Sequence, residues 1–213
     1  MYISKIRIEG FRSFKNHEVE FNDGVNVVIG HNNSGKTSLL KALALVLDYK
    51  SSKRLGIDDF YKGVTLQELQ AKPPEVIVAV TFKQSLDEDM HSEDLALVGD
   101  WLTSLEDPYS ATLTYSFSLP GKHRDAYISV VNALVGSNDE EKKIEALAIV
   151  QREYLRKYVV KIIGGTYSLQ QKAEGDSLEK FDFQFLDAIR DVERDMFTGR
   201  NTLLREVIRF FLD

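Results

Sequence analysis

The sequence predicts a mixed α/β (α+β) fold, in which a glycine-rich loop joins a strand to a long helix beside an antiparallel β-subdomain. Three observations predict it. Residues Gly30–Thr37 read GHNNSGKT and fit the phosphate-loop pattern G-x-x-x-x-G-K-[ST] at every fixed position. Two alternating, strand-like segments precede that loop. Further strand-like segments cluster between residues 75 and 170 with little helix among them, which is unlike a regular βαβ winding.

The phosphate-loop pattern also has the flanks that such a loop needs. An apolar, β-branched run (Val25–Ile29) precedes it, and a strongly helix-forming run (Ser38–Leu47) follows it. Backbone N–H groups at a helix N-terminus form an anion site, to which the helix dipole adds positive charge. We therefore predict a P-loop NTPase that binds a nucleoside triphosphate. The alternative is a chance match in a tight strand-to-helix turn.

Within this loop, Gly30 and Gly35 permit backbone angles and close approaches that a Cβ obstructs. Lys36 is predicted to carry charge to the β- and γ-phosphates, and the Thr37 hydroxyl to ligate Mg²⁺. The other predicted nucleotide-binding residues of the loop are His31, Asn32, Asn33, Ser34 and Ser38. Backbone amides, more than side chains, are expected to face the phosphates.

Composition narrows the functional classes. The chain has 213 residues, of which 43% are hydrophobic and 28% charged, as in ordinary globular proteins. It lacks cysteine, which excludes disulfides, thiolate metal sites and cysteine nucleophiles and fits a cytoplasmic location. No apolar run approaches the length of a membrane span, and the N-terminus is unlike a signal peptide. A net charge of -6 means that any contact with DNA needs a local basic patch.

The first part of the chain reads as a hairpin that leads into the phosphate loop. Strands are predicted over residues 3–8 and 17–21, followed by a turn at 22–24 and a central strand at 25–29. A helix is predicted from Ser34–Gly35 to Asp48–Tyr49, and a loop or short helix over 56–61. Small P-loop kinases and GTPases usually place the loop after the very first strand, so this hairpin favours an ABC-type ATPase.

The rest of the chain is richer in strands. Strands are predicted at 75–82, 110–118, 126–131, 159–163, 166–169 and 181–186, and helices at 85–105, 139–158 and from 201 or 202 onward. We group these as one ATPase lobe over 1–213, with a P-loop core (1–70), an antiparallel β/helical subdomain (75–170) and a return strand and helix (181–213). The apolar face of the last helix fits either truncation or a closing core helix.

The N-terminal residues resemble a known group. Tyr2–Phe14 (YISKIRIEGFRSF), Phe21 and Gly30–Leu40 look like the N-terminal signature of RecF/SMC-like ABC ATPases. Ile57–Tyr61 (IDDFY), the segment 185–195 and Gly199–Thr202 are similar to the overcoming-lysogenization-defect (OLD) family of ATP-dependent nucleases. The resemblance covers the first sixty residues and the last thirty. Between these two parts the chain resembles the family only in its general character.

The resemblance implies an ATP-binding lobe that uses Mg²⁺ and works as a homodimer or higher oligomer, with DNA bound by the full-length protein. In the OLD family a Toprim nuclease follows the ATPase, and such proteins often serve in phage defence. It also implies that Arg12 and Ser13 touch the nucleotide, and that Gln184 lies near the Q-loop glutamine that bridges Mg²⁺ and the attacking water. A solvated turn arginine and an exposed glutamine are the alternatives.

The departures from the family pattern matter as well. We find no Walker B strand, signature loop or Toprim motif; Asp58–Asp59 is the nearest acidic pair, but it lacks a preceding apolar run. We therefore expect those elements C-terminal to this segment and expect the chain alone to be catalytically incomplete. Two alternatives stay open: a RecF/SMC-like DNA repair ATPase without a nuclease, and a small-molecule P-loop kinase.

Overall fold

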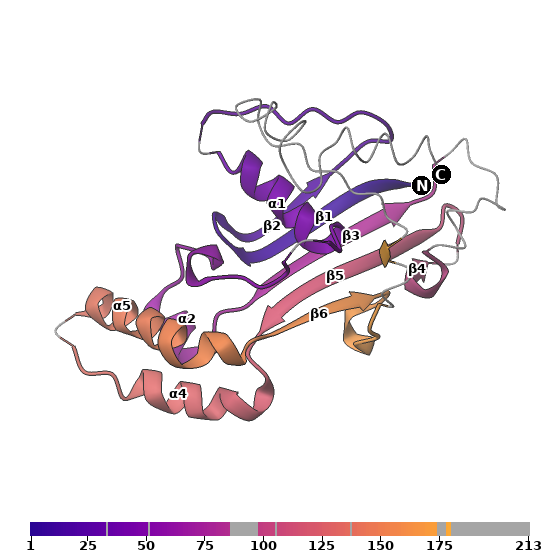
Figure 1. Cartoon of the computed structure of the whole chain (residues 1–213). Coiled ribbons are helices and arrows are strands. Elements are labelled where there is room, and N and C mark those ends of the chain that lie inside the picture. The colour runs from indigo at the N-terminus through magenta and orange to yellow at the C-terminus, as the bar shows by residue number, and fades with distance from the viewer. Residues whose placement is uncertain are drawn as a thin grey trace, which may run out of the picture. The chain divides into compact units, whose positions relative to one another are not determined.

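An antiparallel sheet organises the part of the chain that the structure describes. The structure is a computed structural model that describes residues 1–32, 34–50, 52–85, 98–104, 106–136, 138–173 and 178–179. Its six strands are β1 (Tyr2–Phe11), β2 (Phe14–Glu20), β3 (Val76–Lys83), β4 (Leu102–Ser104), β5 (Ser110–Ser118) and β6 (Val159–Gly164). They run in the order β2-β1-β3-β5-β4, and β6 pairs with β5 (Figure 1).

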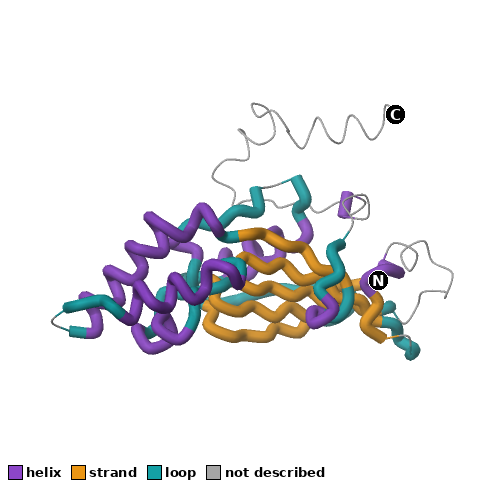
Figure 2. Tube along the Cα trace, turned by 90° about the horizontal axis from the view of Figure 1, so that it is seen from below, coloured by secondary structure: helices purple, strands orange, loops and turns teal. Residues whose placement is uncertain are grey.

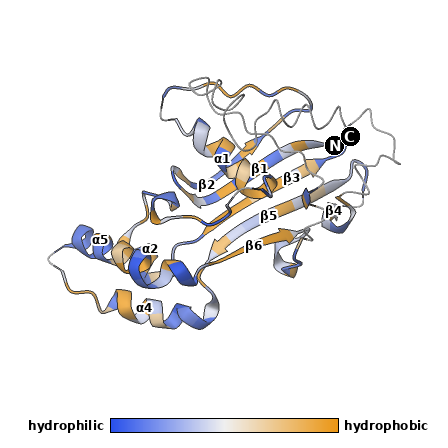
Figure 3. Cartoon of the chain, viewed as in Figure 1, coloured by the Kyte–Doolittle hydropathy of each residue, from blue (hydrophilic) through white to orange (hydrophobic). Residues whose placement is uncertain are grey.

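Alternation along the strands gives the sheet two different faces. In β1, Ile6 and Ile8 are fully buried, and the charged residue between them, Arg7, points to the opposite face. Ile6 pairs with Val19 of β2 and with Val80 of β3, so apolar residues of three strands share one face. Figure 3 shows hydrophobic residues along β3. The register therefore follows from which face carries the apolar side chains.

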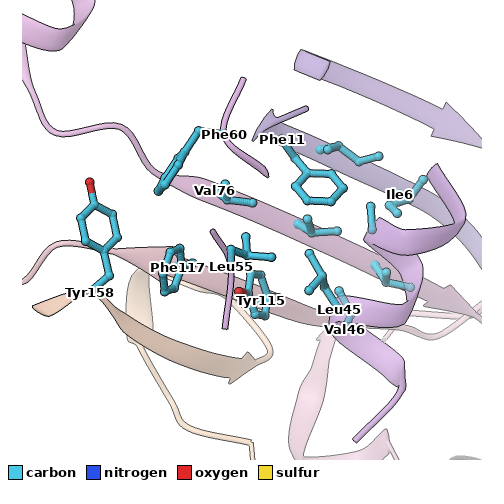
Figure 4. Close-up of a cluster of buried hydrophobic side chains, with 14 of the residues drawn as sticks. Ile6, Phe11, Leu45, Val46, Leu55, Phe60, Val76, Tyr115, Phe117 and Tyr158 are labelled. Carbon is cyan, nitrogen blue, oxygen red and sulfur yellow. The ribbon is translucent and has the colours of Figure 1, made fainter. Parts of the chain in front are cut away.

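Helix α1 (Lys36–Leu47) covers the apolar face. It buries six side chains, among them Leu45 and Val46, which lie in Figure 4 near Ile6 and Tyr115. An aromatic group continues the core: the ring centroids of Phe117 and Tyr158 lie 5.0 Å apart. This packing holds the N-terminal end of α1, and so the phosphate loop, against the sheet.

Three further α-helices of the described residues gather at one end of the sheet (Figures 1 and 2). They are α2 (Leu66–Ala71), α4 (Arg124–Asn132) and α5 (Asp139–Ile149), and α2 contacts both others. Helix α5 continues through a π-helical turn (Val150–Tyr154) into a 3₁₀ turn (Leu155–Lys157). Other 3₁₀ turns span Ile57–Asp59, Gly99–Trp101, Gly121–His123 and Tyr167–Leu169. No helix among the described residues has the length and apolar character needed to cross a membrane.

Most elements predicted from the sequence are present. The hairpin β1–β2 precedes the loop, although its turn lies at Arg12–Ser13. Strands β3, β5 and β6 and helices α1 and α5 also match the predicted segments. The sheet runs across the predicted division between residues 1–70 and 75–170, because β3 pairs directly with β1. That division stays a prediction.

Three strand predictions are wrong in this structure. Residues 126–131 lie in α4, which buries Tyr127 and Val131 at the helical spacing i, i+4. Residues 167–169 form a 3₁₀ turn. The predicted central strand Val25–Ile29 pairs with no described strand and is exposed, with Val25 at 94% and Ile29 at 90%. A strand needs a neighbour for its backbone groups, and the described residues provide none there.

Several predictions lie outside the described residues. They are the strand at 181–186, the helix from 201, most of the helical stretch 85–105, the OLD-like segment 185–195, and two candidate site residues, Asn33 and Gln184. The described end of the stretch 85–105 begins with one α-helical residue, Val98, which is followed by the Gly99–Trp101 turn and β4.

Candidate functional site

The predicted phosphate loop joins the hairpin β1–β2 to α1, and its two fixed glycines lie where a side chain would be strained (Gly35) or crowded (Gly30). Gly35 is the N-cap of α1, with φ +92° and ψ 1°, a left-handed conformation that side chains disfavour. A Cβ at Gly30 would lie 2.7 Å from Ser34 Oγ. The backbone at both positions therefore fits the tight turn that the phosphate-loop motif predicts.

The Lys36 side chain folds back over this loop. Its Nζ donates hydrogen bonds to the carbonyl oxygens of Gly30 (2.6 Å) and His31 (2.7 Å) and lies 3.4 Å from Ser34 Oγ. Among the described residues no carboxylate forms an ion pair with Lys36. The lysine thus places an uncompensated positive charge inside the loop.

The N-terminus of α1 adds further hydrogen-bond donors. No side chain caps this end, and its first turn contains no acidic residue. The first hydrogen bond of the helix runs from the N–H of Leu39 to the carbonyl oxygen of Gly35 (2.9 Å), so the N–H groups before Leu39 have no acceptor within the helix. Open amides together with an ammonium group suit a phosphate chain.

The remaining loop side chains are open to solvent. His31, Asn32, Ser34 and Thr37 are exposed, and Ser38 is half-buried. Among the described residues no group of three or more histidines or acids could hold a metal ion. A hydroxyl such as that of Thr37 suits Mg²⁺ as one ligand when phosphate oxygens and water supply the others. The donor set therefore fits a metal that arrives with a nucleotide.

The turn of the hairpin β1–β2 lies directly against the loop. A Cβ at Gly35 would lie 3.1 Å from both Ser13 Oγ and Phe14 Cζ. Ser13, predicted to touch the nucleotide, is thus beside the phosphate loop. Arg12 occupies the same turn, but its guanidinium is bonded to Asp59, with Nε and Nη2 at 3.0 and 2.8 Å from Oδ1. The sequence does not predict this pairing: there Asp59 is part of the OLD-like segment Ile57–Tyr61 and of an acidic pair that lacks a preceding apolar run.

The far end of α1 is closed by Lys53. Its Nζ donates to the carbonyl oxygens of Ala44 (3.0 Å) and Leu45 (2.9 Å), in the last turn of the helix. Burial lowers the pKa of Lys53 to about 8, and the nearby Asp48 opposes this shift. A cation at this end complements the helix dipole, so it helps to fix the helix that carries the loop.

Comparison with known proteins agrees with the motif. Residues 1–98 match the family described as AAA ATPase domain. This part of the chain, just under half of its length, is thus similar to ATPase domains. The match contains the hairpin β1–β2, the phosphate loop, α1, α2 and β3.

Short segments are also similar to known ATPases. One segment is 44% identical over 48 residues to the structural maintenance of chromosomes protein 3 homolog of Plasmodium falciparum, covering 22% of this chain and 4% of that protein. Another is 44% identical over 45 residues to the DNA double-strand break repair Rad50 ATPase of Methanopyrus kandleri, covering 21% and 5%. A third is 40% identical over 53 residues to the DNA replication and repair protein RecF of Bacillus thuringiensis, covering 25% and 14%.

The chain therefore covers only a small part of the length of these relatives. A solved structure described as "Structural biochemistry of ATP-driven dimerization and DNA stimulated activation of SMC ATPases" matches 68% of this chain and 92% of its own. Its TM-score is 0.35 and its identity 19%, too low to support a conclusion about this fold. The short segments are therefore similar in sequence to SMC, Rad50 and RecF ATPases. A specific similarity to the OLD family is not shown.

Proposed function

We propose that this protein binds the triphosphate of ATP at Gly30–Ser38, as the nucleotide-binding part of an ATPase that works in DNA maintenance. The observation that supports this best is the loop itself: the Lys36 ammonium and the uncapped amides of α1 lie together there, and no carboxylate of the described residues pairs with the lysine. Backbone amides would hold the phosphates, and Lys36 would compensate their charge. Thr37 would contribute one oxygen to Mg²⁺, which supplies charge neutralisation of the phosphates when bound.

The test is ATP binding by calorimetry with two charge-matched variants. K36A should weaken binding about 10-fold or more, because a hydrogen bond to a charged group is worth about 1.5–3 kcal/mol. K41A removes the same charge from an exposed position of the same helix and should leave affinity within about twofold. Equal affinity of K36A and wild type would refute the assignment.

The cellular role is a finer proposal. The Rad50 and RecF relatives are named for DNA repair, which favours the reading without a nuclease. We propose accordingly that the full-length protein contacts DNA and works as a dimer of ATPase heads. Increased affinity for duplex DNA in the presence of ATP and Mg²⁺, without strand cleavage, is the expected result.

An OLD-type nuclease, with a role in phage defence, is the second candidate. It rests on the resemblance of Ile57–Tyr61, of which Asp59 bonds to Arg12 in this structure, and on that of residues 185–195 and 199–202, which lie outside the described residues. Nicking of supercoiled DNA by the full-length protein with ATP and Mg²⁺, lost in K36A, would favour this candidate over the first.

A further inference from the structure

The contact between Arg12 and Asp59 is unusually well fixed for a partly exposed ion pair. Both the Nε and the Nη2 of Arg12 bond to Asp59 Oδ1, and Asp59 Oδ2 accepts the N–H of Gly56 (3.0 Å). The Arg12 guanidinium also lies over the Phe11 ring, 5.2 Å from its centroid. Both carboxylate oxygens are therefore engaged, and the guanidinium is held from two sides.

The backbone around Arg12 is fixed as well. Arg12 adopts a left-handed conformation with φ +50°, which is uncommon for a residue other than glycine. Its N–H donates to the carbonyl oxygen of Asp59 (2.9 Å), and its own carbonyl accepts the N–H of Lys62 (3.0 Å). Residues held in this way in sparsely populated conformations cluster at functional sites.

This fixed turn is the one that touches the phosphate loop. Ser13 follows Arg12 directly, and its Oγ would lie 3.1 Å from a Cβ at Gly35. Asp59 uses one edge of the guanidinium, and among the described residues the other N–H groups of Arg12 have no hydrogen-bond partner. They are donors of the kind that binds phosphate oxygens.

We infer that Asp59 is a positioning residue, which holds the guanidinium of Arg12, in the turn that contacts the phosphate loop, so that its remaining N–H groups meet the nucleotide. The inference rests on the proposed function. An arginine that is already held in place loses less conformational freedom when it binds a ligand. The pair has no net charge, so its contribution is one of orientation more than of attraction.

The experiment is a double-mutant cycle in ATP affinity. D59N should weaken ATP binding about 3- to 10-fold and R12A by at least as much. The double variant should bind no more weakly than R12A alone, because Asp59 acts through Arg12. If D59N does not fold, R12Q tests the same ion pair by removing the charge of its other partner, Arg12. Unfolding of each variant without nucleotide separates an effect on binding from one on stability, because a merely structural ion pair changes only stability.

The matched control is a second ion pair on the same hairpin. Lys15 Nζ lies 2.7 Å from Glu68 Oε1, and E68Q breaks this ion pair while retaining a residue type that suits its capping box with Thr65. E68Q should leave ATP affinity within about twofold of wild type.

Three results would overturn the inference. D59N could bind ATP as well as wild type. It could bind more tightly, which would mean that Asp59 competes with the nucleotide for Arg12. The effects of R12A and D59N could add. If K36A abolishes ATP binding while D59N and R12A leave it unchanged, the proposed function stands and only the inferred positioning role of Asp59 is refuted. If the wild type does not bind ATP, the proposed function falls and this inference with it.

Discussion

Two glycines with almost the same positive φ angle provide a sharp test of the loop. Gly35 has φ +92° and Gly24 has φ +87°. A Cβ at Gly24 would meet nothing within 4 Å, whereas a Cβ at Gly35 would lie 3.1 Å from Ser13 Oγ and Phe14 Cζ. G24A should therefore cost only the left-handed conformation, about 1–2 kcal/mol of unfolding free energy. G35A should cost that amount and, because of crowding, about 1 kcal/mol more.

The two variants should differ more in binding than in stability. G35A shifts the amides at the start of α1, so ATP affinity should fall about 10-fold or more, whereas G24A should stay within about twofold. Urea unfolding gives the free energies, and calorimetry gives the affinities. Equal stability of the two variants would mean that the hairpin turn does not press on the loop. Equal affinity would mean that ATP does not use these amides.

Two further substitutions and one titration test other parts of the structure. Tyr127 is fully buried and its hydroxyl has no partner among the described residues, so Y127F should raise the unfolding free energy by about 1 kcal/mol. In contrast, Y158F loses a 2.7 Å hydrogen bond from the Tyr158 hydroxyl to the carbonyl oxygen of Pro74, so it should lower the unfolding free energy by about 1 kcal/mol. Urea unfolding measures both variants, and a change of the same sign in the two would contradict these hydrogen-bond assignments. Because burial lowers the pKa of Lys53 from 10.5 to about 8, the unfolded chain holds more protons between these values. The unfolding free energy of wild type relative to K53M should therefore rise with pH in that window, and a flat or falling difference would show that Lys53 keeps its ordinary pKa.

The elements predicted correctly are those that a local pattern determines. Strand β3 alternates buried and half-buried residues along most of its length, and Gly35 marks the start of α1 through the loop motif. Helix α5 begins after Asn138, whose side chain accepts the N–H of Glu141 as an N-cap does. Each of these signals lies within a few residues of the element that it specifies.

The failures concern contacts between distant segments. Residues 126–131 combine β-branched and aromatic residues, which favour strands, yet Tyr127 and Val131 are buried on one side of a helix. Asp59 lies in the OLD-like segment Ile57–Tyr61, but its ion pair appears only when the fold brings it to Arg12, 47 positions away. Tertiary contacts thus override local propensity in α4 and create the ion pair at Asp59.

The predicted central strand Val25–Ile29 is the most informative difference. A run with apolar side chains at nearly every position is typical of a strand covered on both faces. In the structure Val27 is 77% exposed and Val28 46%, so the described residues leave one face of this segment largely open and cover the other only in part. Its sequence therefore specifies a neighbour that the described residues do not provide. The loop that follows is held within itself by Lys36, through Gly30 and His31, and against the hairpin by the contact of Gly35 with Ser13. These contacts, more than the preceding segment, fix the predicted phosphate site in this structure.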